Sequence, residues 1–137
     1  MAAPSEARDL SECTLPDGPE WFPLKGHFFN MIGLRTADGV YFIADCLSSE
    51  RIIEKHHVLF IFDVREYLAT LDYVPDLTGE WFVPAHAEAS RDVCPLVEAN
   101  HRKVEEVAEK LLKICAEPLI FEDVLKCVFD FYSLTMD

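Results

Sequence analysis

The chain has 137 residues, of which 50% are hydrophobic and 12% are aromatic, and its formal net charge is −13. This composition is typical of one folded domain and excludes intrinsic disorder. The acidic balance argues against binding to nucleic acid or to anionic membrane surfaces, because both require a basic face. No apolar run reaches the roughly 18 to 20 residues that a membrane-spanning helix needs. Residues 1–20 also lack the basic and apolar regions of a secretory signal.

The first predicted element is an irregular lead-in over residues 1–20, which four short strands follow along the chain. The expected strands cover residues 21–24, 29–36, 40–44 and 80–84. Asp38-Gly39 suits the positive-φ positions of a hairpin turn, so the strands on either side of it are expected to pair. The strand over residues 40–44 is apolar on both faces, which is typical of a strand buried between two layers.

Apolar residues at helical spacing predict the remaining elements. A short helical segment is expected after Ser48, and longer helices over residues 63–74, 92–116 and 121–132. Asp63 and Glu66 have the spacing of a capping box, which marks where the second of these helices begins. The chain therefore runs hairpin, helix, strand, helix, helix, and has too few other elements to cover both faces of its sheet.

The five cysteines are odd in number and widely spaced, and none belongs to a C-x-x-C pair. This pattern argues against a disulfide framework and against a thiolate zinc site. We expect reduced, mostly buried thiols in a cytoplasmic protein. Cys46 could be a reactive thiol, but neighbouring acids should raise its pKa and disfavour the thiolate.

Other side chains that might suggest a site are expected to be structural. Six aromatic residues are assigned to the core rather than to a binding wall: Phe28, Phe29, Phe60, Phe62, Trp81 and Phe82. The adjacent residues His56 and His57 project in different directions, so they are expected to be surface or partly packed histidines. His101 is expected to be an inert residue on a helix.

Three residues stand out by their placement. His27 follows a glycine in a loop between strands, and Asp45 and His86 each follow an apolar strand. Functional groups often project from such loops. Two imidazoles and a carboxylate suit zinc or iron, and a carboxylate can bridge two ions. By spacing alone, the simpler interpretation is three unrelated residues: a turn histidine, a helix-capping aspartate and a surface histidine.

The sequences around these three residues resemble the metallo-β-lactamase superfamily over about residues 15–90. Residues 24–27 resemble its Pro-Gly-His loop, and residues 36–45 resemble its hairpin and Gly-Asp strand end. Residues 82–86, Phe-Val-Pro-Ala-His, are similar to the strand that carries its last metal ligand. The order His, Asp, His also agrees. The helices from Asp92 onward resemble the C-terminal extension of many family members.

The resemblance implies an α/β fold that forms one half of a four-layer αββα sandwich. Residues 1–90 would be the C-terminal half of a metallo-β-lactamase-like domain, and residues 91–137 a helical extension. His27 would be the third histidine of the first metal site, Asp45 the bridging carboxylate and His86 the histidine of the second site. The implied metal is zinc, with iron or manganese as alternatives. In such enzymes a metal-bridging hydroxide attacks an ester, thioester, amide or phosphoester.

The family's N-terminal motif, His-x-His-x-Asp-His, is absent, since no two of the five histidines are separated by a single residue. Lys25 also replaces the common proline, and Ala87 follows the last histidine. We therefore expect no turnover from this chain alone, and small-molecule hydrolysis only when the site is completed. The expected partner is a second copy or a complementing N-terminal half, which would cover the exposed sheet face. The alternative is a non-catalytic protein-interaction domain that keeps the fold without metal.

Overall fold

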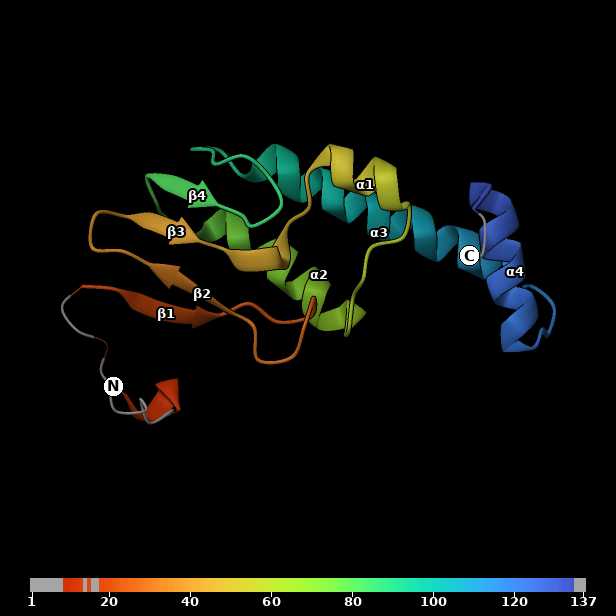
Figure 1. Cartoon of the computed structure of the whole chain (residues 1–137), viewed down its shortest axis with the longest axis horizontal. Helices are drawn as coiled ribbons and strands as arrows, with labels where there is room; N and C mark the ends of the chain where they lie inside the picture. The colour runs from red at the N-terminus through yellow and green to blue at the C-terminus, as the bar shows by residue number, and fades with distance from the viewer. Residues whose placement is uncertain (1–8, 14, 16–17, 135–137) are drawn as a thin grey trace, which may run out of the picture.

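The computed structural model describes residues 9–13, 15 and 18–134, and its centre is one four-stranded sheet (Figure 1). The strands lie in chain order: β1 (Glu20–Pro23), β2 (Ile32–Arg35), β3 (Val40–Phe42) and β4 (Trp81–Val83). The first three pair antiparallel, and β4 pairs parallel to β3. The α/β fold class predicted from the sequence is confirmed.

All four predicted helices are present. They are α1 (Glu50–His56), α2 (Val64–Tyr73), α3 (Cys94–Ile114) and α4 (Phe121–Tyr132). Helix α2 begins after Asp63, whose side chain accepts a hydrogen bond of 3.0 Å from the Glu66 amide, as the capping pattern predicts. Short 3-10 turns cover Leu10–Glu12, Ala44–Cys46 and Val74–Asp76.

Two strands are shorter than predicted, because non-glycine residues with positive φ interrupt the extended backbone. Asn30 has φ of 56°, and β2 begins only at Ile32. Ala44 has φ of 44°, and β3 ends at Phe42. The predicted lead-in lies largely outside the described residues, and its described part includes the turn at Leu10–Glu12.

One face of the sheet packs on the helices and forms the core. The buried cluster joins strand residues such as Tyr41 and Phe82 to Tyr67 and Leu71 of α2 and Val97 of α3. The rings of Tyr41 and Phe82 stack with centroids 5.6 Å apart. This packing explains why the sheet and helices α2 and α3 form one unit.

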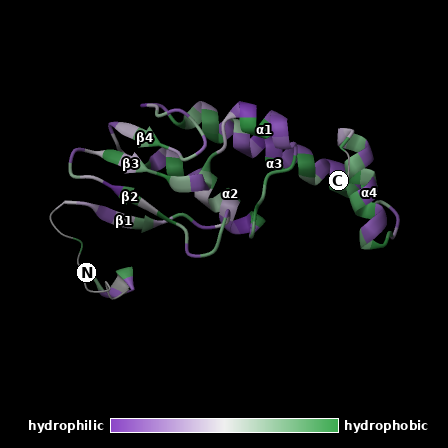
Figure 2. Cartoon of the chain, in the orientation of Figure 1, coloured by the Kyte–Doolittle hydropathy of each residue, from purple (hydrophilic) through white to green (hydrophobic). Residues whose placement is uncertain are grey.

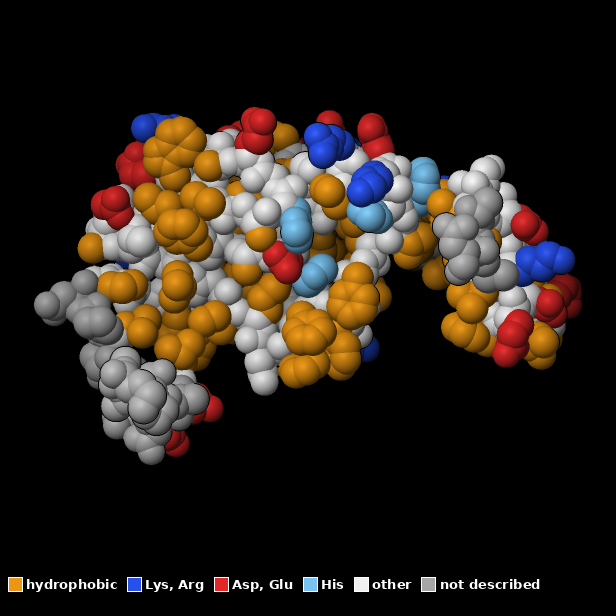
Figure 3. All heavy atoms as spheres, in the orientation of Figure 1, with side chains coloured by type: hydrophobic (Ala, Val, Ile, Leu, Met, Phe, Trp, Pro, Cys, Tyr) orange, Lys and Arg blue, Asp and Glu red, His pale blue; other side chains and the backbone are white. Residues whose placement is uncertain are grey.

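The opposite face of the sheet is open and apolar. Trp21, Leu34, Phe42 and Val83 stand in register across all four strands. The side chains of Trp21, Leu34 and Phe42 are 37%, 38% and 45% exposed. Figure 3 shows this face as a hydrophobic surface over the strands. The pattern of residues 40–44 is typical of a strand buried between two layers, but Phe42 is exposed, and one face of the sheet is open, as expected for this chain alone.

A fully buried amide connects the helices to the segment that follows β3. Asn100 of α3 accepts hydrogen bonds from the Ser48 amide at 3.0 Å and from the Tyr67 hydroxyl at 3.1 Å. Its amide group donates to the carbonyl oxygens of Ser48 and Leu96, both at 2.8 Å. A buried polar side chain that is fully paired in this way fixes the geometry of its neighbours.

The C-terminal end of α3 extends beyond the sheet and carries α4 as an arm (Figure 1). No residue of α4 is buried, although hydrophobic residues run along it (Figure 2). The predicted division into residues 1–90 and 91–137 stays a prediction.

The cysteines differ from the prediction in their burial. All five are free thiols, but only Cys46 is buried, whereas Cys94, Cys115 and Cys127 are exposed. The three exposed cysteines lie on or next to helix faces that no other described element covers. Among the residues that the structure describes, no helix has both the length and the apolarity to cross a membrane.

Candidate functional site

The loop that carries His27 is anchored on the first turn of α2. Gly26 has φ of 103°, and a Cβ at this position would lie 2.1 Å from the Tyr67 amide nitrogen, so only glycine fits. The Gly26 carbonyl accepts hydrogen bonds from the amides of Phe62 and Asp63 at 2.9 and 3.0 Å. These contacts fix the backbone immediately before His27.

Asp45 and His86 lie beyond the carboxyl ends of two neighbouring parallel strands, β3 and β4. The chain turns sharply at Ala44, and the Ala44 carbonyl accepts a hydrogen bond of 2.8 Å from the Ala85 amide. The Ser49 amide donates to the His86 carbonyl at 3.2 Å. Parallel pairing therefore continues past the strands and holds the two side chains at one edge of the sheet.

The three predicted residues come together around the carboxylate. Nε2 of His27 lies 4.0 Å from Oδ2 of Asp45, and Nε2 of His86 lies 3.5 Å from Oδ1. Each imidazole thus faces a different oxygen of one carboxylate. The side chains of His27, Asp45 and His86 are 24%, 41% and 54% exposed, so the cluster is open to solvent.

The distances fit metal ligation only in part. Nitrogen and oxygen ligands at about 2.0 to 2.2 Å from one zinc ion stand roughly 3 to 3.5 Å from each other. The pair His86 and Asp45 meets this separation, and the pair His27 and Asp45 is slightly wider. Within residues 9–13, 15 and 18–134, no group of three or more His, Cys, Asp or Glu residues is arranged to hold one ion.

The other histidines lie away from this cluster, as the sequence predicts. Nε2 of His101 is 3.0 Å from Oδ1 of Asp72 on α2. The ring of His57 stacks on Tyr132 with centroids 5.0 Å apart. His56 is exposed at the end of α1.

Cys46 follows Asp45 directly but is completely buried. Burial raises the pKa of its thiol to about 12, and the negative charge of Asp45 contributes in the same direction. The predicted direction of the pKa shift is confirmed, although burial rather than the neighbouring acid is its main cause. A thiol in this state is a poor nucleophile or metal ligand.

The aromatic residues near the cluster are where the sequence prediction is least accurate. Phe82 is 4% exposed, as expected for the core, but Trp81 is 38% exposed, and Phe28, Phe29, Phe60 and Phe62 are 46%, 57%, 60% and 63% exposed. The ring of Phe60 contacts that of His27, with centroids 5.6 Å apart. One sequence signal was available: in residues 60–62 the phenylalanines alternate with Ile61, and Ile61 packs against the core.

No family model and no curated protein matches the sequence. Among solved structures, the fold is similar to that of a metallo-β-lactamase family protein from Thermus thermophilus, with a TM-score of 0.61 and 18% identity. The chain shares the metallo-β-lactamase-like fold. The alignment covers 96% of this chain and 46% of the other, so this chain spans about half the length of that protein.

Proposed function

We propose that this chain is the C-terminal portion of a metallo-β-lactamase-fold hydrolase and supplies three ligands to a two-metal centre. His27 would be a ligand of the first ion and His86 of the second, and Asp45 would be shared by both. The observation that carries this proposal is that the two imidazoles face different oxygens of the same carboxylate, at 4.0 and 3.5 Å.

The proposed metal is zinc, with iron or manganese as alternatives, because imidazole and carboxylate ligands suit all three. Bound metal ions would lower the pKa of a bridging water and so supply a hydroxide for attack on an ester, thioester, amide or phosphoester. The protein's part is to hold the imidazoles of His27 and His86 on either side of the Asp45 carboxylate. The anchoring of Gly26 on α2 and the pairing of β3 with β4 support this role.

The remaining ligands would come from a complementing N-terminal half, or from a second copy that takes its place. Two observations support such a partner. The sheet has an open apolar face next to the cluster, and apolar surface of this kind usually marks an interaction site. The similar solved structure is also about twice as long as this chain. On this proposal, the chain alone binds metal weakly and has no turnover.

A second candidate function is a non-catalytic protein-interaction domain that keeps the fold without metal. The same open sheet face favours it. In the part of the chain that the structure describes, no group of three or more His, Cys, Asp or Glu side chains is arranged to hold one ion, and this also favours the second candidate.

Equilibrium dialysis against zinc, followed by elemental analysis, separates the two candidates. The proposal predicts bound zinc in the wild-type chain and its loss in His86→Ala and Asp45→Asn. His101→Ala is the matched control, because it removes an imidazole that pairs with Asp72 away from the cluster. Zinc binding that is equal in all variants, or absent from the wild type, would favour the interaction domain.

A further inference from the structure

Four exposed phenylalanines form one continuous surface, which we call the aromatic wall: Phe28, Phe29, Phe60 and Phe62. Phe28 stacks on Phe29 with ring centroids 4.4 Å apart, and it also approaches Phe60 at 6.3 Å. Phe29 meets Phe62 edge-on at 5.7 Å. These separations are those of interacting aromatic pairs. Residues from two loops, far apart in the sequence, are therefore held together while remaining exposed to solvent.

One end of the wall touches the proposed metal centre. The rings of Phe60 and His27 meet edge-on, with an interplanar angle of 75°. A group lying on the wall at Phe60 would therefore be next to the imidazole that faces Asp45. In Figure 3, the acidic and histidine side chains lie between the hydrophobic surface of the sheet and a second hydrophobic surface below them.

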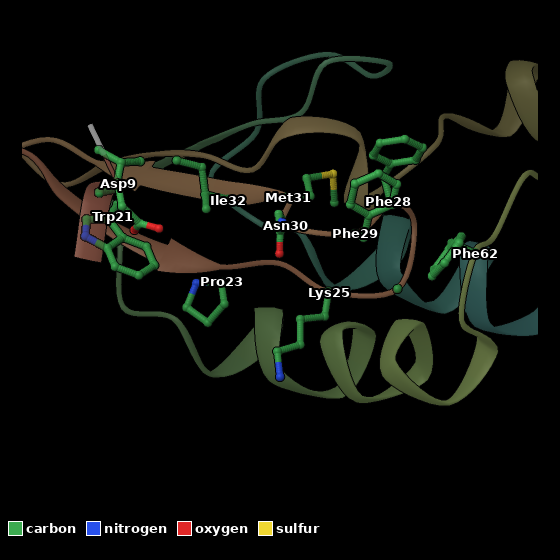
Figure 4. A pocket seen from close by; sticks show the side chains of 12 residues that line it. Asp9, Trp21, Pro23, Lys25, Phe28, Phe29, Asn30, Met31, Ile32 and Phe62 are labelled. Carbon is green, nitrogen blue, oxygen red and sulfur yellow. The ribbon is translucent and has the colours of Figure 1, made fainter. Parts of the chain in front are cut away.

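The other end of the wall borders a cavity of about 540 Å³. Figure 4 shows Phe28, Phe29 and Phe62 toward one end of the lining and Trp21 at the other, with Asn30 and Met31 between them. Cavities that hold small molecules usually have volumes of about 300 to 1,000 Å³ and mostly apolar linings. The cavity therefore has the size of a small-molecule site rather than of a surface irregularity.

Asp9 and Lys25 are the charged side chains among the residues that line the cavity, and the charges around it disfavour an anionic ligand. The ammonium group of Lys25 lies 3.6 Å from the Glu66 carboxylate, so its charge is already balanced by a neighbour. The chain as a whole carries a net charge of −13, which disfavours anions. Exposed aromatic rings bind apolar groups through burial and ring stacking.

We propose that the aromatic wall binds the apolar aryl or alkyl group of an ester, thioester or amide that carries no negative charge, and whose scissile carbonyl then reaches the edge of the sheet at His27 and Asp45. This inference rests on the proposed function and specifies its substrate class. A protein layer would more readily cover the flat open face of the sheet, whereas the wall borders a cavity whose lining includes Gly26 and Phe28, the two neighbours of His27 in the chain.

The test uses N-phenyl-1-naphthylamine, a neutral aromatic dye whose fluorescence rises in apolar sites, titrated into the full chain in the presence of EDTA. We expect saturable binding, with the dissociation constant weakened about tenfold in Phe28→Ser and in Phe62→Ser, because each removes a ring that the dye would stack on. Two controls remove equally exposed phenylalanines elsewhere: Phe131→Ser on α4, and Phe42→Ser on the open sheet face. Both should change the dissociation constant less than about twofold.

Three results would overturn the inference: no saturable binding to the wild type, an equal loss of binding in Phe42→Ser, or a change from oligomer to monomer in Phe62→Ser by sedimentation. The last result would assign the wall to a protein interface. Because EDTA removes metal from this assay, a failure of zinc binding leaves the dye result unchanged. The proposed function and the proposed ligand site can therefore fail independently.

Discussion

The two faces of the sheet are built from the same strands but have different roles. On the covered face, Tyr41 and Phe82 are 7% and 4% exposed and stack against each other beneath the helices. On the open face, the adjacent residue Phe42 is 45% exposed, in register with Leu34 and Val83. Burial on the covered face stabilises this chain. The open face contributes little to the stability of the chain alone, and its apolar surface is available for a partner.

The largest expected effect is on the covered face. Phe82→Ala should lower the free energy of unfolding by about 3 to 5 kcal/mol, because it leaves a cavity under Tyr41. Phe42→Ala, one strand away on the open face, should change it by less than about 0.5 kcal/mol. Urea denaturation followed by circular dichroism measures both. Equal losses in the two variants would mean that the open face is covered in solution, for instance by a second copy, and sedimentation of the wild type would then detect the oligomer.

A second, smaller effect is expected at Asn100, which connects the covered side of the fold to the segment after β3 that is paired with His86. Asn100→Leu removes four hydrogen bonds and leaves the polar groups of Ser48 and the Tyr67 hydroxyl unpaired. Buried groups that lose their partners cost about 1 to 3 kcal/mol each, so a total loss of about 3 kcal/mol is expected.

Tyr67→Phe is the matched variant for this prediction, because it removes one hydroxyl and leaves the Asn100 contacts to Ser48 intact. It should cost only about 1 kcal/mol. Ser48 is bridged to His86, so Asn100→Leu should also weaken zinc binding relative to Tyr67→Phe at a temperature where both variants are folded. Equal zinc affinity in the two variants would show that Asn100 stabilises the fold without positioning His86.

The sequence predicts elements well where the signal is local. The boundaries of α4 and the cap of α2 at Asp63 follow from helical periodicity and from capping chemistry within a few residues. The start of β2 and the end of β3 cannot be predicted in this way. Asn30 and Ala44 adopt positive φ, which a sequence indicates only where the residue is glycine. Strand lengths in this chain depend on how its loops pack.

For the candidate site as well, local sequence predicts one part and contacts between distant segments determine the other. The choice of His27, Asp45 and His86 came from their local sequences. Their approach to each other depends on contacts between distant segments, such as Gly26 against Tyr67, that no local pattern specifies. The exposure of the aromatic wall was missed for a related reason: an aromatic residue predicts burial only where the rest of the chain supplies a cover.

The smallest expected effect concerns the arm, which, like the open face, leaves apolar side chains exposed. Glu106 of α3 forms ion pairs with Lys110 and Lys103, and its carboxylate accepts a hydrogen bond of 3.4 Å from the Tyr132 hydroxyl of α4. The hydrogen bond from Lys110 holds the pKa of Glu106 below its usual value. A lowered carboxyl pKa stabilises the fold above the usual pKa and loses this effect as the pH falls through the lowered value.

Glu106→Gln should therefore lower the free energy of unfolding by about 0.5 kcal/mol at pH 7, since the group is partly exposed and screened by solvent. The difference from wild type should shrink as the pH is lowered toward 3, and urea midpoints at several pH values measure it. Glu98→Gln is the matched control, because Glu98 pairs with Arg102 on the same helix without reaching α4. If both variants behave alike, the effect belongs to α3 alone, and α4 is held on α3 by its apolar contacts rather than by the Glu106 network.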